Sequence, residues 1–170
     1  MAKVYRCAME ALYRLCIAVA SVALLIMTLS IPYGVFMRYV MNDAASWPEP
    51  AAILMVLVFT FIGAAACYRA GVHIAVLLLI NRLQPVPQRI VVGFVHLVMT
   101  AIALFMLIWG ARLVGTTWAQ YLAEFPWLRT GVSYLPIPVG GAITLLFIIE
   151  RLWLGPPPAD SYTFREPVED

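Results

Sequence analysis

Charged residues are scarce in this chain of 170 residues. Lysine and arginine together number 11 and aspartate and glutamate 9, so that 12% of the chain is charged, against roughly 25% in soluble proteins. So few charges cannot cover the surface of a water-soluble globule. A net charge of +2 is also too small to form a phosphate-binding surface, which excludes nucleic acid as a partner.

Cysteines are also few. The three cysteines, Cys7, Cys16 and Cys67, are odd in number and form no C-x-x-C pair. They lie in or beside apolar stretches, where we expect reduced packing residues rather than a disulfide framework or a zinc site. The cysteines therefore predict no metal site. We also expect no cofactor and no catalytic residue, and hence a protein that is not an enzyme.

Hydrophobic residues dominate instead, at 64% of the chain. Four windows without Asp, Glu, Lys or Arg contain 23, 19, 22 and 20 residues, and about 20 helical residues cross a hydrocarbon layer of roughly 30 Å. The short alternating segments of a β-barrel are absent, so the spans must be helices. The windows are 15–37, 50–68, 90–111 and 130–149.

These windows predict an all-α integral membrane protein with one domain, residues 1–154. Its four transmembrane helices are expected at about 15–37, 50–68, 90–111 and 132–153. The first window follows Lys3, Arg6 and Arg14 as the core of a signal peptide would. Its apolar run is too long for that, and it lacks a small-x-small cleavage site, so we expect it to stay as an anchor.

The positions of lysine and arginine predict the orientation of the chain. With a cytoplasmic amino terminus, only Arg38, Arg112 and Arg129 would lie outside. Eight basic residues would lie inside: Lys3, Arg6, Arg14, Arg69, Arg82, Arg89, Arg151 and Arg165. The positive-inside rule thus predicts a multi-pass membrane protein with both termini in the cytoplasm.

Two shorter segments complete the predicted layout. Residues 74–80 form an apolar run of seven, too short to cross a bilayer, so we expect a segment that lies at the inner interface after the second helix. Residues 155–170 begin with glycine and three prolines and are rich in acidic side chains. They are expected to form a disordered cytoplasmic tail.

Ionisable residues are missing from the middle of every window. A charge at the centre of a membrane helix costs at least about 2.5–3.5 kcal/mol and is retained for a function, so we expect substrate and coupling ion to bind elsewhere. The polar residues there include five hydroxyl residues, each of which is expected to bond back to its own helix. They are Thr28, Ser30, Thr60, Thr100 and Thr144.

His96 is the single polar ring within a window. An ordinary hydrogen bond between helices accounts for it. Alternatively, His96 and His73 could supply axial ligands to a haem, and the chain would then be a haem- or quinone-associated anchor subunit of a redox complex. A stand-alone small channel or exporter is a third hypothesis.

An ordered series of residues runs through the first two predicted helices. It reads Arg38-Tyr39-x-x-Asn42, then Trp47-x-Glu49, then Gly63-Ala64, then Arg69-x-Gly71-x-His73-Ile74-x-Val76. The series resembles the small membrane (DctQ-type) subunit of tripartite ATP-independent periplasmic (TRAP) transporters, whose pattern is R-Y-x-x-N, W-x-E-E and G-A-x-x-x-x-R-x-G-x-H-I-x-V-D. The stretch from Tyr134 through Pro138 to Gly140 is similar to the proline-containing start of the family's last helix.

Two positions depart from this pattern. Pro50 stands where the family has its second acidic residue, and Leu77 stands where it has the final aspartate. An ion pair that depends on those carboxylates in relatives must be formed differently here, or be absent.

The resemblance implies a function and a set of partners. The chain would be a scaffold subunit that binds a large permease subunit, sits among membrane lipids and meets a periplasmic substrate-binding protein on its outer face. The large subunit would carry the substrate and sodium sites for uptake of an organic acid, and this chain would bind no substrate. The candidate motif or interface residues are Arg38, Asn42, Trp47, Glu49, Gly63, Arg69, Gly71, His73, Pro138 and Gly140.

Each candidate also has a local physical interpretation. Arg38 and Glu49 either pair or stay solvated, and Asn42 suits a tight turn. Gly63 and Gly140 allow another helix, from this chain or a partner, to approach closely. Arg69 and His73 share a helical face and could contact lipid headgroups, the interfacial segment or a partner loop, headgroup contact being the simplest.

Overall fold

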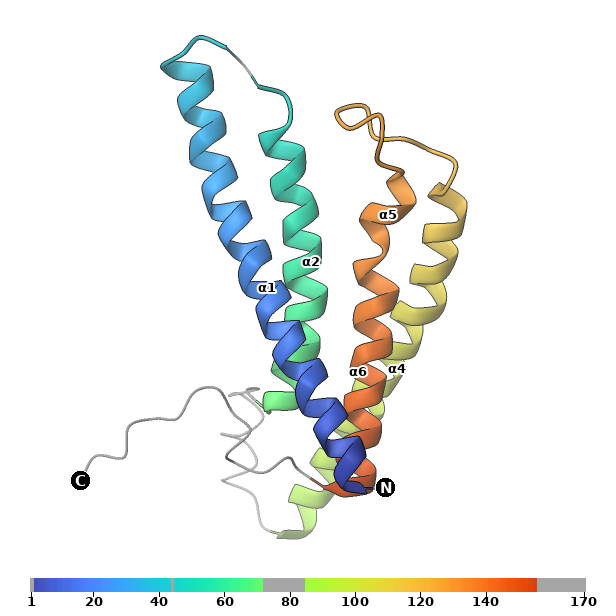
Figure 1. The fold of residues 1–170 in the computed structure, drawn as a ribbon. Helices are drawn as coiled ribbons and strands as arrows, with labels where there is room; N and C mark the ends of the chain where they lie inside the picture. Colours follow the sequence, from blue (N-terminus) through green and yellow to red (C-terminus); the bar gives the residue numbers. More distant parts are fainter. Residues whose placement is uncertain (1, 44, 72–84, 156–170) are drawn as a thin grey trace, which may run out of the picture.

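The fold, seen in a computed structural model that describes residues 2–43, 45–71 and 85–155, is an antiparallel bundle of helices (Figure 1). Its long helices are α1 (Ala2–Tyr39), α2 (Pro48–Ala70), α4 (Pro85–Thr117) and α6 (Pro136–Leu154), and the one-turn helix α5 (Thr130–Tyr134) precedes α6. Among the described residues, four stretches are long and apolar enough to cross a membrane: Val4–Tyr39, Pro48–Ala70, Val91–Thr117 and Thr130–Leu154. The predicted class, an all-α protein with four transmembrane helices, is confirmed.

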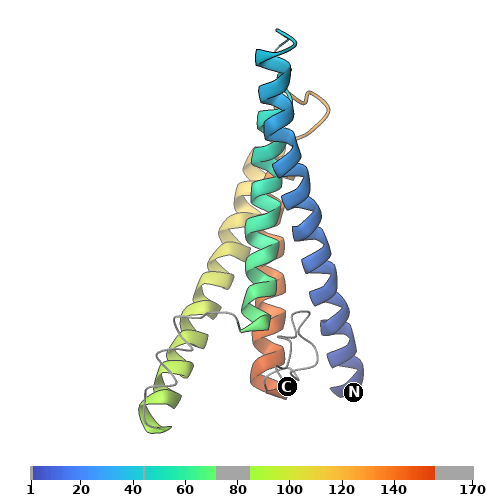
Figure 2. The same ribbon diagram turned by 90° about the vertical axis from the view of Figure 1, so that its left-hand side faces the viewer.

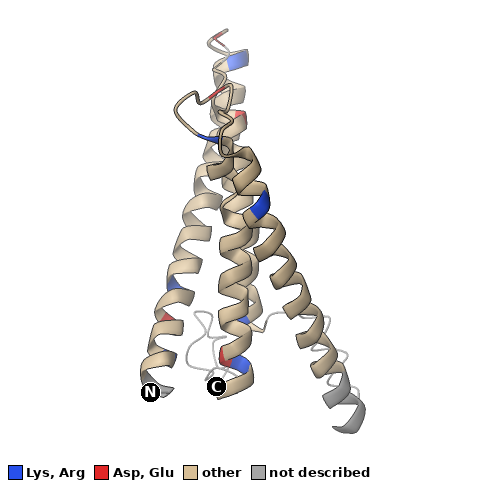
Figure 3. Ribbon diagram, turned by 90° about the vertical axis from the view of Figure 1, so that its right-hand side faces the viewer, with Lys and Arg blue, Asp and Glu red and all other residues tan. Residues whose placement is uncertain are grey.

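Helices α2 and α6 lie in the centre of the bundle, with α1 against α2 and α4 against α6 (Figures 1 and 2). The start of α1 and the end of α6 are at the same end of the molecule, here called the terminal end. The opposite end, called the loop end, holds the α1–α2 and α4–α5 connections. Figure 3 shows charged residues towards both ends and an uncharged band between them.

Helix α1 begins at Ala2, well before the predicted start at residue 15. The added turns are helical because their apolar side chains continue the buried stripe of the span. Along α1 the buried residues follow a spacing of four and three, which keeps one seam against the neighbouring helices. They are Met9, Tyr13, Cys16, Ala20, Ala23 and Ser30.

Helices α2 and α6, which follow the connections at the loop end, each begin with a proline. Pro48 occupies the first position of α2 and Pro136 the first position of α6, where the missing amide hydrogen has no partner to lose. Pro138 follows within the first turn of α6. The fourth span, predicted as one helix over 132–153, is therefore divided into α5 and α6 at Leu135, whose amide bonds to the Val132 carbonyl oxygen at 3.2 Å.

Two adjacent glycines allow α6 to pack between two helices. A Cβ atom at Gly140 would lie 2.8 Å from the backbone oxygen of Phe61 in α2, and one at Gly141 would lie 2.8 Å from that of Ala103 in α4. Pro138 of α6 also packs against Gly110 of α4. A Cβ atom at Gly110 would lie 2.9 Å from the Cδ atom of Pro138. Consecutive residues without side chains thus give α6 close contact with both neighbours.

The hydroxyl residues within the helices behave largely as the sequence predicts. Ser30 donates to the Ile26 carbonyl oxygen at 2.7 Å, Thr100 to that of His96 at 2.7 Å and Thr144 to that of Gly140 at 2.8 Å. The other two, Thr28 and Thr60, are exposed on the apolar surface. The predicted interfacial segment 74–80, His73 and tail residues 156–170 lie outside the described residues.

We expect alanine at Gly140 or Gly141 to destabilise the bundle. The added methyl group meets a backbone oxygen that cannot turn away, so the free energy of unfolding should fall by about 1–3 kcal/mol. Equilibrium unfolding in mixed micelles measures the change. Gly93→Ala is the matched control, because a Cβ there has open space and alanine favours helix; equal losses at Gly93 and Gly140 would contradict the packing.

Candidate functional site

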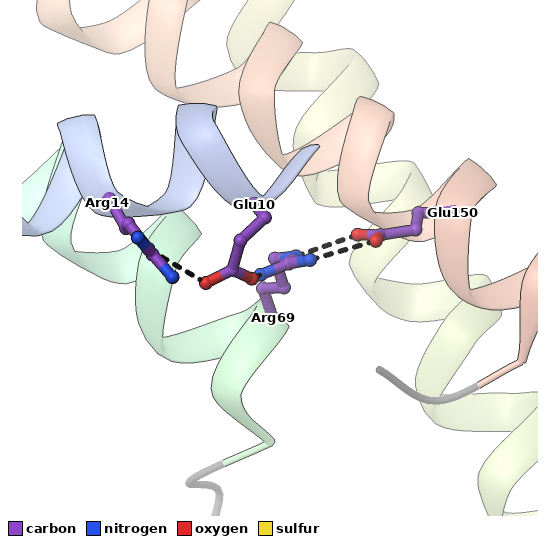
Figure 4. A network of polar contacts seen from close by, with 4 residues as sticks. All are labelled: Glu10, Arg14, Arg69 and Glu150. Atoms are coloured by element: carbon purple, nitrogen blue, oxygen red, sulfur yellow. Dashed lines mark hydrogen bonds and ion pairs between the residues drawn. The ribbon is translucent and has the colours of Figure 1, made fainter. Parts of the chain in front are cut away.

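A buried ion-pair network joins three helices near the terminal end (Figure 4). Arg69 in the last turn of α2 donates through Nε to Glu150 Oε2 at 2.8 Å and through Nη2 to Glu150 Oε1 at 2.9 Å. Its Nη1 donates to Glu10 Oε2 at 2.9 Å. All three guanidinium nitrogens therefore bond to carboxylates, one on α6 and one on α1.

The exposed fraction of the side chains decreases along the network from Arg14 to Glu150. The Arg14 side chain is 75% exposed and bonds through Nε to Glu10 Oε1 at 3.1 Å, while Glu10 is 22% exposed. Arg69 and Glu150 are 5% and 4% exposed. The four charges alternate in sign from the surface to the interior, so that each buried charge faces an opposite one.

Aromatic rings complete the surroundings of Arg69. Its guanidinium carbon lies 5.0 Å from the ring centre of Tyr13 and 5.5 Å from that of Phe147. A desolvated cation is attracted by ring faces at such distances. Tyr13, Phe147 and Arg69 are all buried, so the network is part of the hydrophobic core rather than a solvated patch.

The simplest expectation for Arg69, contact with lipid headgroups, is wrong. Because α1 extends back to Ala2, Glu10 lies on a helix next to the buried Met9 rather than in a tail. Because α6 continues to Leu154, Glu150 faces the bundle one residue beyond the charge-free window. Sequence reasoning missed both carboxylates; the spacing of four between Glu10 and Arg14, which favours an ion pair on one helical face, was the available signal.

The carboxylates of this network do not come from the positions at which the chain departs from the family pattern. Pro50 lies in the first turn of α2, at the opposite end from Arg69, and Leu77 is outside the described residues. Glu10 and Glu150 supply the acidic partners of Arg69 instead.

Gly71 ends α2 two residues after Arg69. Its φ of 70° and ψ of 17° are left-handed, and its amide bonds back to the carbonyl oxygens of Cys67 and Tyr68. Glycine adopts this conformation without the steric cost that a Cβ adds, as is common at helix ends. The chain can therefore leave α2 immediately after placing Arg69 in the core.

A second polar contact between helices lies in the same half of the molecule. The hydroxyl group of Tyr68 in α2 and Nδ1 of His96 in α4 are 2.8 Å apart. The interhelical hydrogen bond expected for His96 is thus confirmed. His73, its hypothetical partner in binding haem, lies outside the described residues, and the described residues contain no group of three or more His, Cys, Asp or Glu that could hold a metal ion.

The loop end gathers four of the candidate residues around one connection. Arg38 Nη2 and Glu49 Oε1 are 3.1 Å apart, so the ion pair between them is present. Asn42 has a φ of 51°, the left-handed turn conformation that asparagine tolerates. Trp47 packs against Tyr33 with ring centres 5.3 Å apart. These contacts fasten the α1–α2 hairpin.

The remaining candidates lie between the two ends. A Cβ at Gly63 would be 3.8 Å from that of Ala20, so the neighbour of this glycine is α1 of the same chain. Pro138 and Gly140 contact α4 and α2 as described above. Among the described candidates, four thus lie together at the loop end, Arg69 lies in the ion-pair network near the terminal end, and the small residues make helix contacts between them. In the part of the chain that the structure describes, these contacts hold helices together, and the candidates are not gathered at one place.

We expect the two ion pairs to differ in strength. Arg69→Met should lower the free energy of unfolding by about 3–5 kcal/mol, because it leaves the buried Glu150 without its partner and Glu10 with Arg14 alone. Arg38→Met, the matched control at an exposed pair, should cost less than about 1 kcal/mol. Arg69→Lys should fall between them, since an ammonium group cannot form the fork to Glu150. Equal losses for Arg69→Met and Arg38→Met in mixed-micelle unfolding would refute this ranking.

Comparison with known proteins identifies the family of this chain. A protein of Haemophilus influenzae, provisionally named a TRAP transporter small permease protein, is 26% identical over 143 residues, which cover 84% of this chain and 86% of that protein. Residues 27–155 match the family profile described as tripartite ATP-independent periplasmic transporters, DctQ component. Because this match spans most of the chain and all four membrane helices in whole or part, the protein belongs to the DctQ family of TRAP transporter small permease subunits.

Proposed function

We propose that this small permease subunit is a membrane scaffold for a large permease subunit. In this assignment the large subunit carries out sodium-driven uptake of an organic acid, and a periplasmic binding protein delivers that acid. The scaffold itself supplies orientation and packing surface and holds neither the substrate nor the sodium ion.

The proposal rests on the observation that the buried charges bond to one another. Arg69 and Glu150, which could have served as ligands for a solute or an ion, bond to each other, and Glu10 bonds to Arg69. Polar groups retained within a membrane commonly mark a transport pathway, yet here they connect helices of the same chain. The network favours a structural subunit over a stand-alone channel.

The outward surface supports a role in assembly. Within the span Val91–Thr117 of α4, only 6% of an 18-residue apolar stretch is buried inside the bundle. Large side chains such as Phe94, Leu97 and Phe105 are exposed. A surface of this kind needs lipid or another membrane protein around it. The redox-anchor alternative has no comparable support, because the family is one of transporter components.

For the orientation, we propose that the terminal end is cytoplasmic and the loop end periplasmic, in a bacterial inner membrane. The excess of lysine and arginine in the segments of the terminal end supports this direction. The loop end would then be the side that meets the binding protein.

The assembly is tested by affinity capture of the tagged chain from native membranes. We expect a much larger polytopic membrane protein to be captured with it, transport in liposomes only when both are present, and no substrate binding by the isolated chain in calorimetry. Capture of a soluble redox subunit, or stoichiometric binding of a solute to the isolated chain, would overturn the proposal.

The orientation is tested separately by cysteine labelling. In a chain without its native cysteines, Ser46→Cys at the loop end should react with a membrane-impermeant maleimide in cells whose outer membrane alone is permeable. A chain that keeps only Cys7, exposed at the terminal end, should react after the inner membrane is opened. The reverse pattern would show the opposite orientation.

A further inference from the structure

A groove of about 380 Å³ lies between α1 and α2 in the half of the hairpin nearer the loop end. Apart from Glu49, the residues that line it are apolar, and the groove is shallow and open to the surroundings. Among the residues that line it are Met27, Ile31, Glu49, Ala52, Ile53 and Val56.

The groove exists because a small residue lies between large ones. Ala52 is buried and forms the floor, whereas Ile31, Ile53 and Val56 are 53%, 63% and 42% exposed and form the sides. On α2 the lining extends from Glu49 to Leu57, a helical length of about 12 Å. The groove therefore runs along the helix from the charged loop end towards the uncharged middle of the span.

A cation and an anion stand at the charged end of this groove. Arg38 and Glu49 share one contact, Nη2 to Oε1, and their side chains remain 52% and 75% exposed. A smaller hollow of about 70 Å³ shares Ile31 and Glu49 with the groove and is also lined by Ser30 and Arg38. The pair thus keeps room for a guanidinium to bind a phosphate and for a carboxylate to accept further N–H groups.

We propose that this groove binds one phospholipid whose headgroup contains both a phosphate and a primary ammonium, as in phosphatidylethanolamine. The phosphate contacts Arg38, the ammonium donates to Glu49, and an acyl chain lies in the apolar groove. The direction of the groove matches that of a lipid in a bilayer, with its head at the membrane edge and its chain along the helices.

Charge complementarity selects this occupant over others. An anionic headgroup without an ammonium leaves Glu49 next to a second negative charge. A choline headgroup has a positive charge but no N–H to donate to the carboxylate. An apolar helix of a partner or of a second copy fills the groove but desolvates Arg38 and Glu49 without supplying new partners, which is costly.

The test is native mass spectrometry of the full chain in mild detergent with an equal mixture of phosphatidylethanolamine, phosphatidylcholine and phosphatidylglycerol of distinguishable mass. We expect one phosphatidylethanolamine per chain, retained about fivefold more than the others, a ratio typical of one exposed charged contact. Glu49→Gln should remove this preference. Val56→Trp should lower retention of all three lipids by filling the groove.

Leu97→Trp is the matched control, because Leu97 is 68% exposed on α4, away from the groove, and lipid retention should not change. Circular dichroism of each variant confirms that its helical content is intact. Equal retention of the three lipids by the native sequence, an unchanged preference in Glu49→Gln, or unchanged lipid retention in Val56→Trp would each refute the proposal. Crosslinking from Ile53→Cys to a protein rather than to lipid in native membranes would also refute it.

Discussion

The pairing of Arg69 with Glu10 and Glu150 fixes the relative positions of three helices. A charge removed from water is tolerated only when opposite charges and hydrogen bonds replace its hydration. Arg69 obtains these from α1 and α6 at once, at distances of 2.8–2.9 Å. Any displacement of one helix along another would leave a carboxylate or the guanidinium unpaired. The network therefore sets the register of helices whose apolar surfaces alone would allow many registers.

Away from this network, shape rather than charge determines the packing. Apolar side chains gain little by leaving lipid for another helix, so membrane helices associate through close contact of small residues. Gly140 and Gly141 give α6 such contact with α2 and α4, and the alanines on the buried seam of α1 give it contact with α2. The central position of α6 follows from these two adjacent glycines.

The two ends of the bundle use their charges differently. At the terminal end, Arg69 and Glu150 are buried and serve the fold. At the loop end, Arg38 and Glu49 pair while more than half of each side chain stays exposed, so they fasten the hairpin and remain accessible. The proposed scaffold role needs both properties, because such a subunit would hold its own shape while its outer surface contacts lipids and partner subunits.

The number of spans was predictable because charge-free windows of about 20 residues reflect the cost of placing a charge in hydrocarbon, a local property of the chain. The turn at Asn42 and the helix starts at Pro48 and Pro136 also follow from local backbone chemistry. The partners of Arg69 were not predictable in this way. Glu10 and Glu150 are 59 and 81 positions away from it, and only the packing of α1 and α6 against α2 brings them together. The sequence by itself determined which segments become membrane helices; the tertiary structure decided which faces of those helices meet, because that choice depends on contacts between residues distant in the chain.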